Sequence, residues 1–149
     1  MTDNAMEQVS EAMIIGEALS WRGTPYKHQA SCKGAGCDCL GLVRGVYGAF
    51  WGEPEKPPAY SPDWADANGQ ETLKEAASRY LTEQSVDAMK PSHVLLFRYK
   101  AGYPAKHAGI LIEEDRFLHA QYGSGVSLVS LSPWWWRHLA CVFAFPTFR

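Results

Sequence analysis

The periodicity of apolar residues changes once along this chain, near Lys90-Pro91, and this change limits the possible folds more than any other feature. Before it, apolar residues recur every three to four positions, as in amphipathic helices. After it, short runs rich in β-branched and aromatic residues alternate with short links, as in antiparallel strands. Helices followed by strands indicate an α+β fold. With 149 residues, the chain is expected to form one domain over residues 1–149.

The pattern predicts three helices packed on a mostly antiparallel sheet of about five strands. The helices are expected at residues 4–20, 38–50 and 71–81, with Asn4 and Asp38 as N-caps. Gly52 and Pro54 should end the second helix, and residues 54–62 should form an ordered surface loop. The strands are expected at residues 94–99, 106–112, 116–121, 126–131 and 141–145.

Charge and composition argue against several classes of function. The net charge of −2 offers no basic surplus for binding the phosphates of nucleic acid. No apolar run approaches the roughly 20 residues that span a bilayer, and the first residues lack the positive start of a signal peptide. The protein is therefore expected to be made in the cytoplasm without a signal peptide and to act elsewhere only if something delivers it.

Cys39 stands at the expected start of the second helix and is the first candidate for chemistry. A helix N-terminus carries partial positive charge and free N–H groups, which lower the pKa of a thiol and can bind an oxyanion. Gly41 allows a close approach of substrate or of another element. From the local sequence alone, a buried cysteine with no chemical role is the alternative.

His107 and His119 are the candidates for a base and for the group that orients it. Whether they meet depends on the hairpin between their strands. An odd loop, Glu113-Glu114-Asp115, sets Gly109 opposite His119 and puts both imidazoles on one face of the sheet, about 7 Å apart by Cβ. A two-residue turn, Glu114-Asp115, puts them on opposite faces. We predict the odd loop, in which Gly109 leaves room for the rings.

Five motifs in order resemble the NlpC family of cell-wall cysteine peptidases, and together they run from about residue 20 to residue 120. The family has a Gly-x-Pro-Tyr element, an Asp-Cys-Ser-Gly-Leu-Val helix start, a Pro-Gly-Asp-Leu-Val-Phe strand, a His-Val/Ala-Gly-Ile strand and an Ile-His-Ala strand. The matching segments here are Trp21-Arg22-Gly23-Thr24-Pro25-Tyr26, Asp38-Cys39-Leu40-Gly41-Leu42-Val43, Pro91-Ser92-His93-Val94-Leu95-Leu96-Phe97, Lys106-His107-Ala108-Gly109-Ile110 and Phe117-Leu118-His119-Ala120.

The resemblance implies a papain-like α+β fold and a cysteine peptidase that hydrolyses an amide bond of peptidoglycan stem peptides, of the γ-D-glutamyl–diaminopimelate type. It implies Cys39 as nucleophile, His107 as base and His119 as the orienting group, with no metal or organic cofactor. The expected reaction starts from a Cys39 thiolate paired with protonated His107. The substrate-binding residues expected from the same motifs are Tyr26, Asp38, Leu40 and Gly41.

The chain most resembles the phage-tail and gene-transfer-agent branch of that family. This likeness implies tail proteins as partners beside peptidoglycan, and action at the cell wall or periplasm after delivery by a tail-like particle. Two rival functions are an acyltransferase on the same Cys-His site and a structural tail protein whose catalytic site has decayed. Two departures from the motifs are Leu40, where the family has Ser, and Ser92-His93, where it has Gly-Asp.

The remaining cysteines and histidines have simpler interpretations. Cys32, Cys37 and Cys39 with His28 would suit zinc only if a second pair of ligands followed, and none does. Two free thiols at Cys32 and Cys37 are expected, although a disulfide between them is the alternative. The histidines expected at the surface or in structural hydrogen bonds are His28, His93 and His138.

Trp134-Trp135-Trp136 is an unusual cluster of aromatic residues. We predict that two of the three rings pack and that at least one faces outward, where it would offer a contact surface for a tail partner or for sugar.

Overall fold

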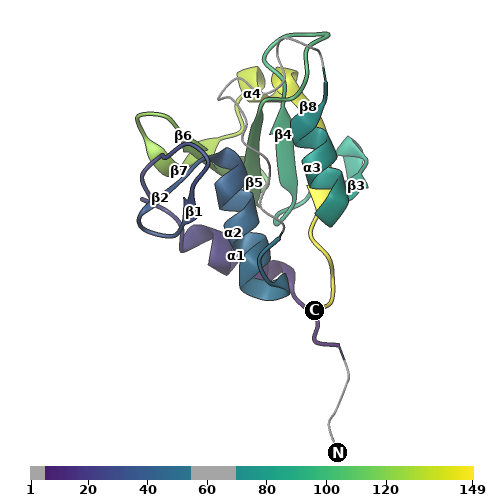
Figure 1. The fold of residues 1–149 in the computed structure, drawn as a ribbon. Helices are drawn as coiled ribbons and strands as arrows, with labels where there is room; N and C mark the ends of the chain where they lie inside the picture. Colours follow the sequence, from purple (N-terminus) through teal and green to yellow (C-terminus); the bar gives the residue numbers. More distant parts are fainter. Residues whose placement is uncertain (1–5, 55–69) are drawn as a thin grey trace, which may run out of the picture.

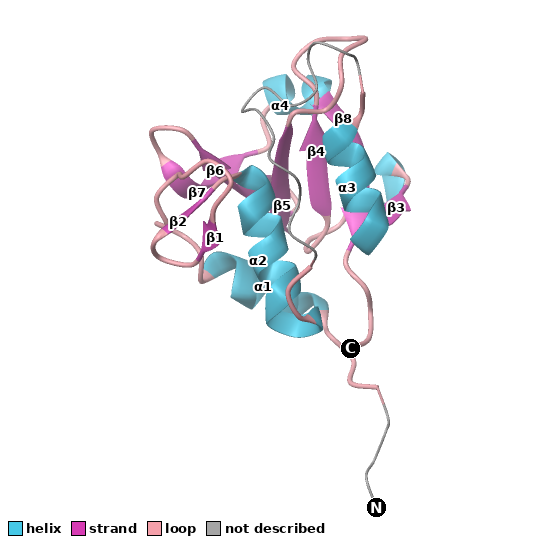
Figure 2. Ribbon diagram, viewed as in Figure 1, coloured by secondary structure: helices cyan, strands magenta, loops and turns pink. Residues whose placement is uncertain are grey.

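Six antiparallel strands form one sheet in a computed structural model that describes residues 6–54 and 70–149 (Figures 1 and 2). The strands are β3 (Thr82–Gln84), β4 (Val94–Phe97), β5 (His107–Glu113), β6 (Arg116–Gln121), β7 (Gly125–Ser130) and β8 (Leu139–Ala144). Their order across the sheet is β3-β8-β4-β5-β6-β7. The predicted α+β class and antiparallel sheet are confirmed. The sixth strand, β3, was not predicted, because three polar residues at a sheet edge carry no alternating pattern.

Three helices lie on one face of this sheet (Figure 1). They are α1 (Glu11–Leu19), α2 (Cys39–Trp51) and α3 (Thr72–Tyr80). A short hairpin of β1 (Ser31–Cys32) and β2 (Gly36–Cys37) precedes α2, a 3-10 turn η1 (Val86–Ala88) follows β3, and a one-and-a-half-turn helix α4 (Pro133–His138) lies at one end of the sheet. In the described ranges no helix has the length and apolar character that crossing a membrane requires.

The first helix begins later than predicted. Its N-cap is Ser10, whose hydroxyl accepts the N–H of Met13 at 3.1 Å. The preceding residues are extended, because they pair with the end of the chain: the N–H of Val9 donates to the carbonyl of Thr147 at 2.8 Å. The predicted helical start over residues 6–10 is therefore wrong, and Asn4 lies outside the described residues.

The second and third helices have nearly their predicted limits. Asp38 is the N-cap of α2, as expected, and Gly52 ends the helix with a φ of 81°. A positive φ is the conformation in which glycine carries no Cβ penalty. The third helix begins one residue after its predicted start. Most of the predicted 54–62 loop, from residue 55 onward, lies outside the described residues.

The sheet separates two apolar clusters. One cluster joins the helices to the sheet and contains Leu42 and Val46 of α2 with Ile110 of β5. The other lies on the opposite face and is built around Phe97 and Phe117. Because successive side chains of a strand alternate between faces, His107 and His119 share the second face with the phenylalanines.

The hairpin between β5 and β6 has the predicted register, but its turn differs from the predicted one. The turn is the two-residue Glu114-Asp115 form, because Glu113 pairs with Arg116, so the predicted odd loop is wrong. A bulge between Leu111 and Glu113 absorbs the extra residue, and Leu111 then pairs with Phe117. The bulge thus restores the parity that places both histidines on one face, as predicted.

The turn before β4 forms although a serine occupies it. Ser92 adopts a φ of 84°, a conformation that L-residues rarely adopt. Its N–H donates to the carbonyl of Leu111 at 2.8 Å, which ties the turn to β5. His93 is buried, and its Nδ1 accepts the N–H of Lys90 at 3.3 Å, which agrees with the structural role expected for it.

The tryptophan cluster forms α4, which was not predicted. Trp135 packs against the Phe97–Phe117 cluster, whereas Trp134 and Trp136 are 42% and 45% exposed. Successive residues of a helix point about 100° apart, so only one of three neighbouring rings can face the sheet. Trp134 also packs, because its ring contacts those of Trp135 and His138 at 4.9 and 3.9 Å, so two rings pack as expected although only Trp135 joins the apolar cluster. At least one ring was expected to face outward, and both Trp134 and Trp136 are exposed.

Two glycines of α2 provide a test of this packing. A Cβ at Gly45 would lie 2.0 Å from the ring of Trp21, whereas the nearest atoms to a Cβ at Gly48 belong to Glu53, at 3.8 Å. We expect Gly45→Ala to lower the free energy of unfolding by about 1–3 kcal/mol. The matched Gly48→Ala should raise it by about 0.5–1 kcal/mol through helix propensity. Urea denaturation measures both, and stabilisation by both variants would contradict the packing described.

Candidate active site

Cys39 is the first residue of α2 and is 7% exposed. The Asp38 carboxylate fixes this helix end, because its Oδ1 accepts the N–H of Gly41 and its Oδ2 the N–H of Gln29, each at 2.7 Å. A Cβ at Gly41 would lie 1.8 Å from the carbonyl oxygen of Ala30, so only glycine allows the loop to pack this closely. Asp38 and Gly41 therefore fix the first turn of α2, which carries Cys39, against the loop that precedes it.

His107 and His119 form a hydrogen-bonded pair of imidazoles, with His107 Nε2 and His119 Nδ1 2.7 Å apart. They are 7% and 1% exposed. The β5–β6 ladder makes its last pairing toward this end between Ile110 and Leu118. The predicted Gly109–His119 pairing is therefore not among those formed, and a Cβ at Gly109 would lie 2.6 Å from the ring of Phe117. Gly109 leaves room for Phe117 rather than for the imidazoles.

The thiol approaches the beginning of β5, next to His107. The backbone N–H of Ala108 faces the sulfur and favours its ionised form, as do the N–H groups of Leu40 and Cys39. Nε2 of His107 is hydrogen-bonded to His119, so Nδ1 is the imidazole nitrogen of His107 that could accept the thiol proton. Within residues 6–54 and 70–149 no hydrogen bond joins the sulfur to His107, and such bonds commonly tighten only when substrate binds.

The protonation states differ from those expected at a helix N-terminus. Burial and the Asp38 carboxylate raise the pKa of Cys39 to about 12, and the three backbone N–H groups only oppose this. Burial and the neighbouring imidazole lower the pKa of His107 to about 3, and burial lowers the pKa of His119 to about 4. These shifts favour an uncharged thiol and an uncharged imidazole at neutral pH over the expected resting thiolate–imidazolium pair. A neutral imidazole can accept the thiol proton as attack proceeds.

Aromatic rings surround the imidazole of His107. The Trp135 and Tyr99 rings lie nearly parallel to it, at centroid distances of 5.7 and 6.4 Å. Trp134 contacts both of these rings, at 4.9 Å from Trp135 and 6.0 Å from Tyr99. Sequence patterns did not connect Trp135 or Tyr99 with the site. The tryptophan cluster was a signal for the first, and nothing in the pattern marked the second.

Tyr26 lies close enough to the thiol for Cys39 to affect its pKa. A parallel bridge joins it to Cys37, and its ring meets that of Tyr122 edge to face at 5.8 Å. Burial, with Cys39 and Asp38 nearby, raises the pKa of Tyr26 to about 12, so its hydroxyl keeps its proton. A phenol that stays protonated beside the thiol can donate a hydrogen bond to a bound substrate.

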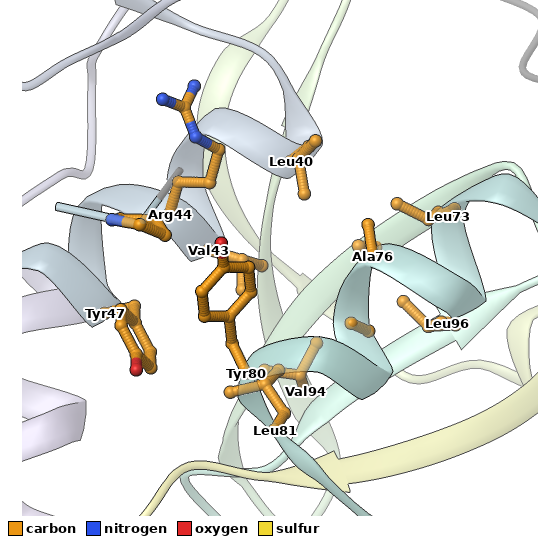
Figure 3. Close-up of a pocket in the computed structure, with 13 residues that line it drawn as sticks. Leu40, Val43, Arg44, Tyr47, Leu73, Ala76, Tyr80, Leu81, Val94 and Leu96 are labelled. Atoms are coloured by element: carbon orange, nitrogen blue, oxygen red, sulfur yellow. The ribbon is translucent and has the colours of Figure 1, made fainter. Parts of the chain in front are cut away.

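Leu40, the residue after Cys39, contributes to an apolar pocket between α2, α3 and the β4–β5 part of the sheet (Figure 3). Ala108, whose N–H faces the sulfur, lines the same pocket. The pocket thus shares Ala108 with the surroundings of the thiol, and Leu40 makes its wall apolar at the position where the resembling family has serine.

The other cysteines lie apart from this chemistry. Cys32 is exposed and Cys37 is buried, and both are free. Cys32 pairs with Gly36 and Ser31 with Cys37, so the two cysteines point to opposite faces of the hairpin. Among the residues described, no group of three metal-ligating side chains could hold a metal ion. His28 lies 3.8 Å from the Asp38 carboxylate, and His138 Nδ1 lies 2.5 Å from the carbonyl of Trp134.

Comparison with known proteins places this geometry in context. The sequence matches the NlpC/P60 family over residues 23–143. An Escherichia coli protein named Murein DD-endopeptidase MepS/Murein LD-carboxypeptidase is 26% identical over 127 residues, which cover 85% of this chain and 58% of that protein. A Bacillus subtilis protein named Gamma-DL-glutamyl hydrolase is 28% identical over 130 residues, 86% of this chain and 27% of that protein. The chain thus spans little more than half of the first of these relatives.

Solved structures agree in fold. The NlpC/p60 domain of the peptidoglycan hydrolase SagA superposes with a TM-score of 0.64 at 24% identity, over 92% of this chain and 100% of that one. A Bacillus cereus NlpC/P60 family protein gives a TM-score of 0.66 at 16% identity, over 95% of this chain and 42% of that one. At these identities the likeness establishes the fold.

The buried imidazoles should make the fold sensitive to acid. Their pKa values lie below 6.5 in the folded protein, so the unfolded chain binds protons first as the pH falls below that value. Stability is therefore full above about pH 6.5 and is lost toward pH 4. We expect the two groups to lower the free energy of unfolding by about 3 kcal/mol between pH 6.5 and 5.0, as measured by urea denaturation.

A His107→Gln/His119→Gln double variant is the control for this loss. Its stability should fall by about 3 kcal/mol less over the same pH interval. An identical pH dependence in the double variant and the parent would show that other groups cause the loss.

Proposed function

Because this chain belongs to the NlpC/P60 family, we propose that it is a cysteine peptidase that hydrolyses an amide bond in the stem peptides of peptidoglycan. The observation that carries the proposal is the placement of the Cys39 thiol, at the start of α2, against the backbone N–H of Ala108. Ala108 follows His107 on β5, and the imidazole of His107 is hydrogen-bonded to that of His119. A nucleophile, a base and a group that orients the base are the parts that such a reaction needs.

In the first half of the reaction, the Cys39 sulfur attacks the carbonyl carbon of the scissile amide while its proton passes to Nδ1 of His107. The uncharged resting pair makes this a concerted transfer rather than attack by a thiolate formed beforehand. Backbone N–H groups at the start of α2 stabilise the oxyanion. His107 then gives its proton to the departing amine, and a thioester to Cys39 remains.

In the second half, water replaces the amine. Neutral His107 takes a proton from water as the oxygen attacks the thioester carbon, and the proton then returns to the sulfur as the acid leaves. His119 holds Nε2 of His107 throughout, which keeps Nδ1 directed to the reacting atoms.

The bond we propose is the one between γ-D-glutamate and diaminopimelate. The motif resemblance and the Bacillus subtilis relative named a gamma-DL-glutamyl hydrolase support this choice. The Escherichia coli relative is named a DD-endopeptidase and LD-carboxypeptidase, so cleavage at the D-alanine end of the stem is the alternative bond. Defined muropeptides separate the two, because the fragments differ in mass.

We further propose that a phage-tail or gene-transfer-agent particle delivers the enzyme to the cell wall. The support is the resemblance of the motif set to that branch of the family. The Escherichia coli relative is named for murein cleavage and the Bacillus subtilis relative for gamma-DL-glutamyl hydrolysis. Neither name mentions a tail particle, so the delivery route rests on the motifs alone.

Digestion of defined muropeptides tests the activity. With a disaccharide tetrapeptide whose stem is L-alanyl-γ-D-glutamyl-diaminopimelyl-D-alanine, mass spectrometry should detect the disaccharide dipeptide and the released diaminopimelyl-D-alanine. We expect Cys39→Ala and His107→Ala to lower the rate by about 10³-fold or more, and His119→Ala by about 10–100-fold. Cys32→Ala is the matched control, because Cys32 is an exposed free thiol, and it should keep full activity.

Each other outcome identifies a different function. Full activity in Cys39→Ala would exclude the mechanism. Transfer of the acyl group to an added amine in preference to water would identify an acyltransferase. A folded parent protein that cleaves neither bond would indicate a structural protein with a decayed site.

A further inference from the structure

We propose that Trp135 is a positioning residue of this site: its indole covers the His107–His119 hydrogen bond, excludes water from it and holds the His107 ring in the orientation that the thiol requires. The role in catalysis rests on the proposed function, whereas the shielding of the imidazole pair is independent of it.

Trp135 contacts both imidazoles from α4. Its ring lies 5.7 Å from that of His107 at an interplanar angle of 29°, and 5.5 Å from that of His119 at 89°. One indole therefore stacks on the first imidazole and meets the second at a right angle. A ring held in both ways fixes the tilt of each imidazole relative to the other.

The indole is itself held firmly. It meets the ring of Phe97 at 4.7 Å and that of Phe117 at 5.1 Å, both at steep angles, and packs with the cluster on the second face of the sheet. Phe117 in turn occupies the space above Gly109, at the point where β5 and β6 part. Trp135 therefore packs over Phe117 at the end of the β5–β6 ladder, next to the two histidines.

The hydrogen bonding of His119 shows why this cover matters. For His107 to accept the thiol proton at Nδ1, its Nε2–H must donate to Nδ1 of His119. His119 then carries its own proton on Nε2, which is buried and has no hydrogen-bond partner in the described ranges. Water admitted here would raise the local dielectric and compete for Nδ1 of His119, which would weaken the hydrogen bond that orients His107.

Among the described residues, the rings that contact the imidazole of His107 are uncharged at neutral pH. They belong to Phe97 of β4, Tyr99 after it, His119 of β6 and Trp135 of α4. The Cys39 thiol from α2 lies against the N–H of Ala108, the next residue. Burial is the largest cause of the lowered pKa of both His107 and His119. Removing the indole should therefore raise both pKa values toward 6.5.

Trp136 supplies a matched control. It is the same residue type on the same helix, one position later, but it is 45% exposed and lies outside the apolar cluster that Trp135 joins. A general loss of helix α4 would affect both substitutions, whereas loss of shielding would affect only Trp135.

The test uses the full chain with Cys39→Ala and ¹⁵N-labelled histidine, so it needs no substrate. NMR should show His107 and His119 neutral from pH 7.5 to 5 in this parent and in Trp136→Ala. With Trp135→Ala, both imidazoles should titrate within that range, a rise of more than one pH unit, and Trp135→Phe should give a smaller rise. An unchanged titration in folded Trp135→Ala, or equal shifts from Trp136→Ala, would overturn the proposal.

Turnover by the enzyme with Cys39 intact is the second readout. Trp135→Ala should lower kcat about 10–100-fold and move the acidic limb of the kcat/KM profile to higher pH, with partial rescue by Trp135→Phe. Absence of turnover in the parent would contradict the proposed function and leave the titration result standing. If Trp135→Ala does not fold, the imidazole titrations of Trp135→Phe and Trp136→Phe are compared instead. A rise in both pKa values with Trp135→Phe alone supports the proposal, and equal or absent shifts overturn it.

Discussion

The hydrogen bond between His107 and His119 is the interaction on which the site depends. It forms because a bulge in the β5–β6 hairpin returns both residues to one face of the sheet, and because the ladder makes its last pairing at this end between Ile110 and Leu118. Buried under aromatic rings, the two imidazoles stay neutral at physiological pH. A neutral base beside a neutral thiol is a resting state that avoids two buried charges, and charge then develops only as the reaction proceeds.

Asp38 links this chemistry to the stability of the fold. Its carboxylate caps α2 and also accepts the backbone N–H of Gln29, so it anchors both the helix and the loop packed against it. The same negative charge raises the pKa of the adjacent thiol. The residue that builds the helix start therefore adds to the effect of burial in favouring a protonated Cys39 at rest. In the proposed mechanism the attack then requires transfer of this proton to His107.

Sequence patterns could predict most of the fold and the three groups of the candidate site. Period and turn residues locate five of the six strands, and Asp38 marks the start of α2 because capping is a local interaction. What they missed depends on contacts between distant segments. The chain before Glu11 is extended because it pairs with the C-terminal residues, and the bulge at Leu111 depends on how the hairpin packs. The thiol pKa was misjudged because burial, which the sequence does not show, outweighs the helix end.

The central claim is that Cys39 forms a covalent bond with the acyl part of a stem peptide. Rapid acid quenching of a single turnover, followed by mass spectrometry of the digested protein, observes this bond directly. The account predicts a transient mass increase on the peptide that contains Cys39, equal to the acyl fragment and removable by hydroxylamine. Release of product at the full rate with no adduct on Cys39 at any time, or with the adduct on another residue, would contradict it.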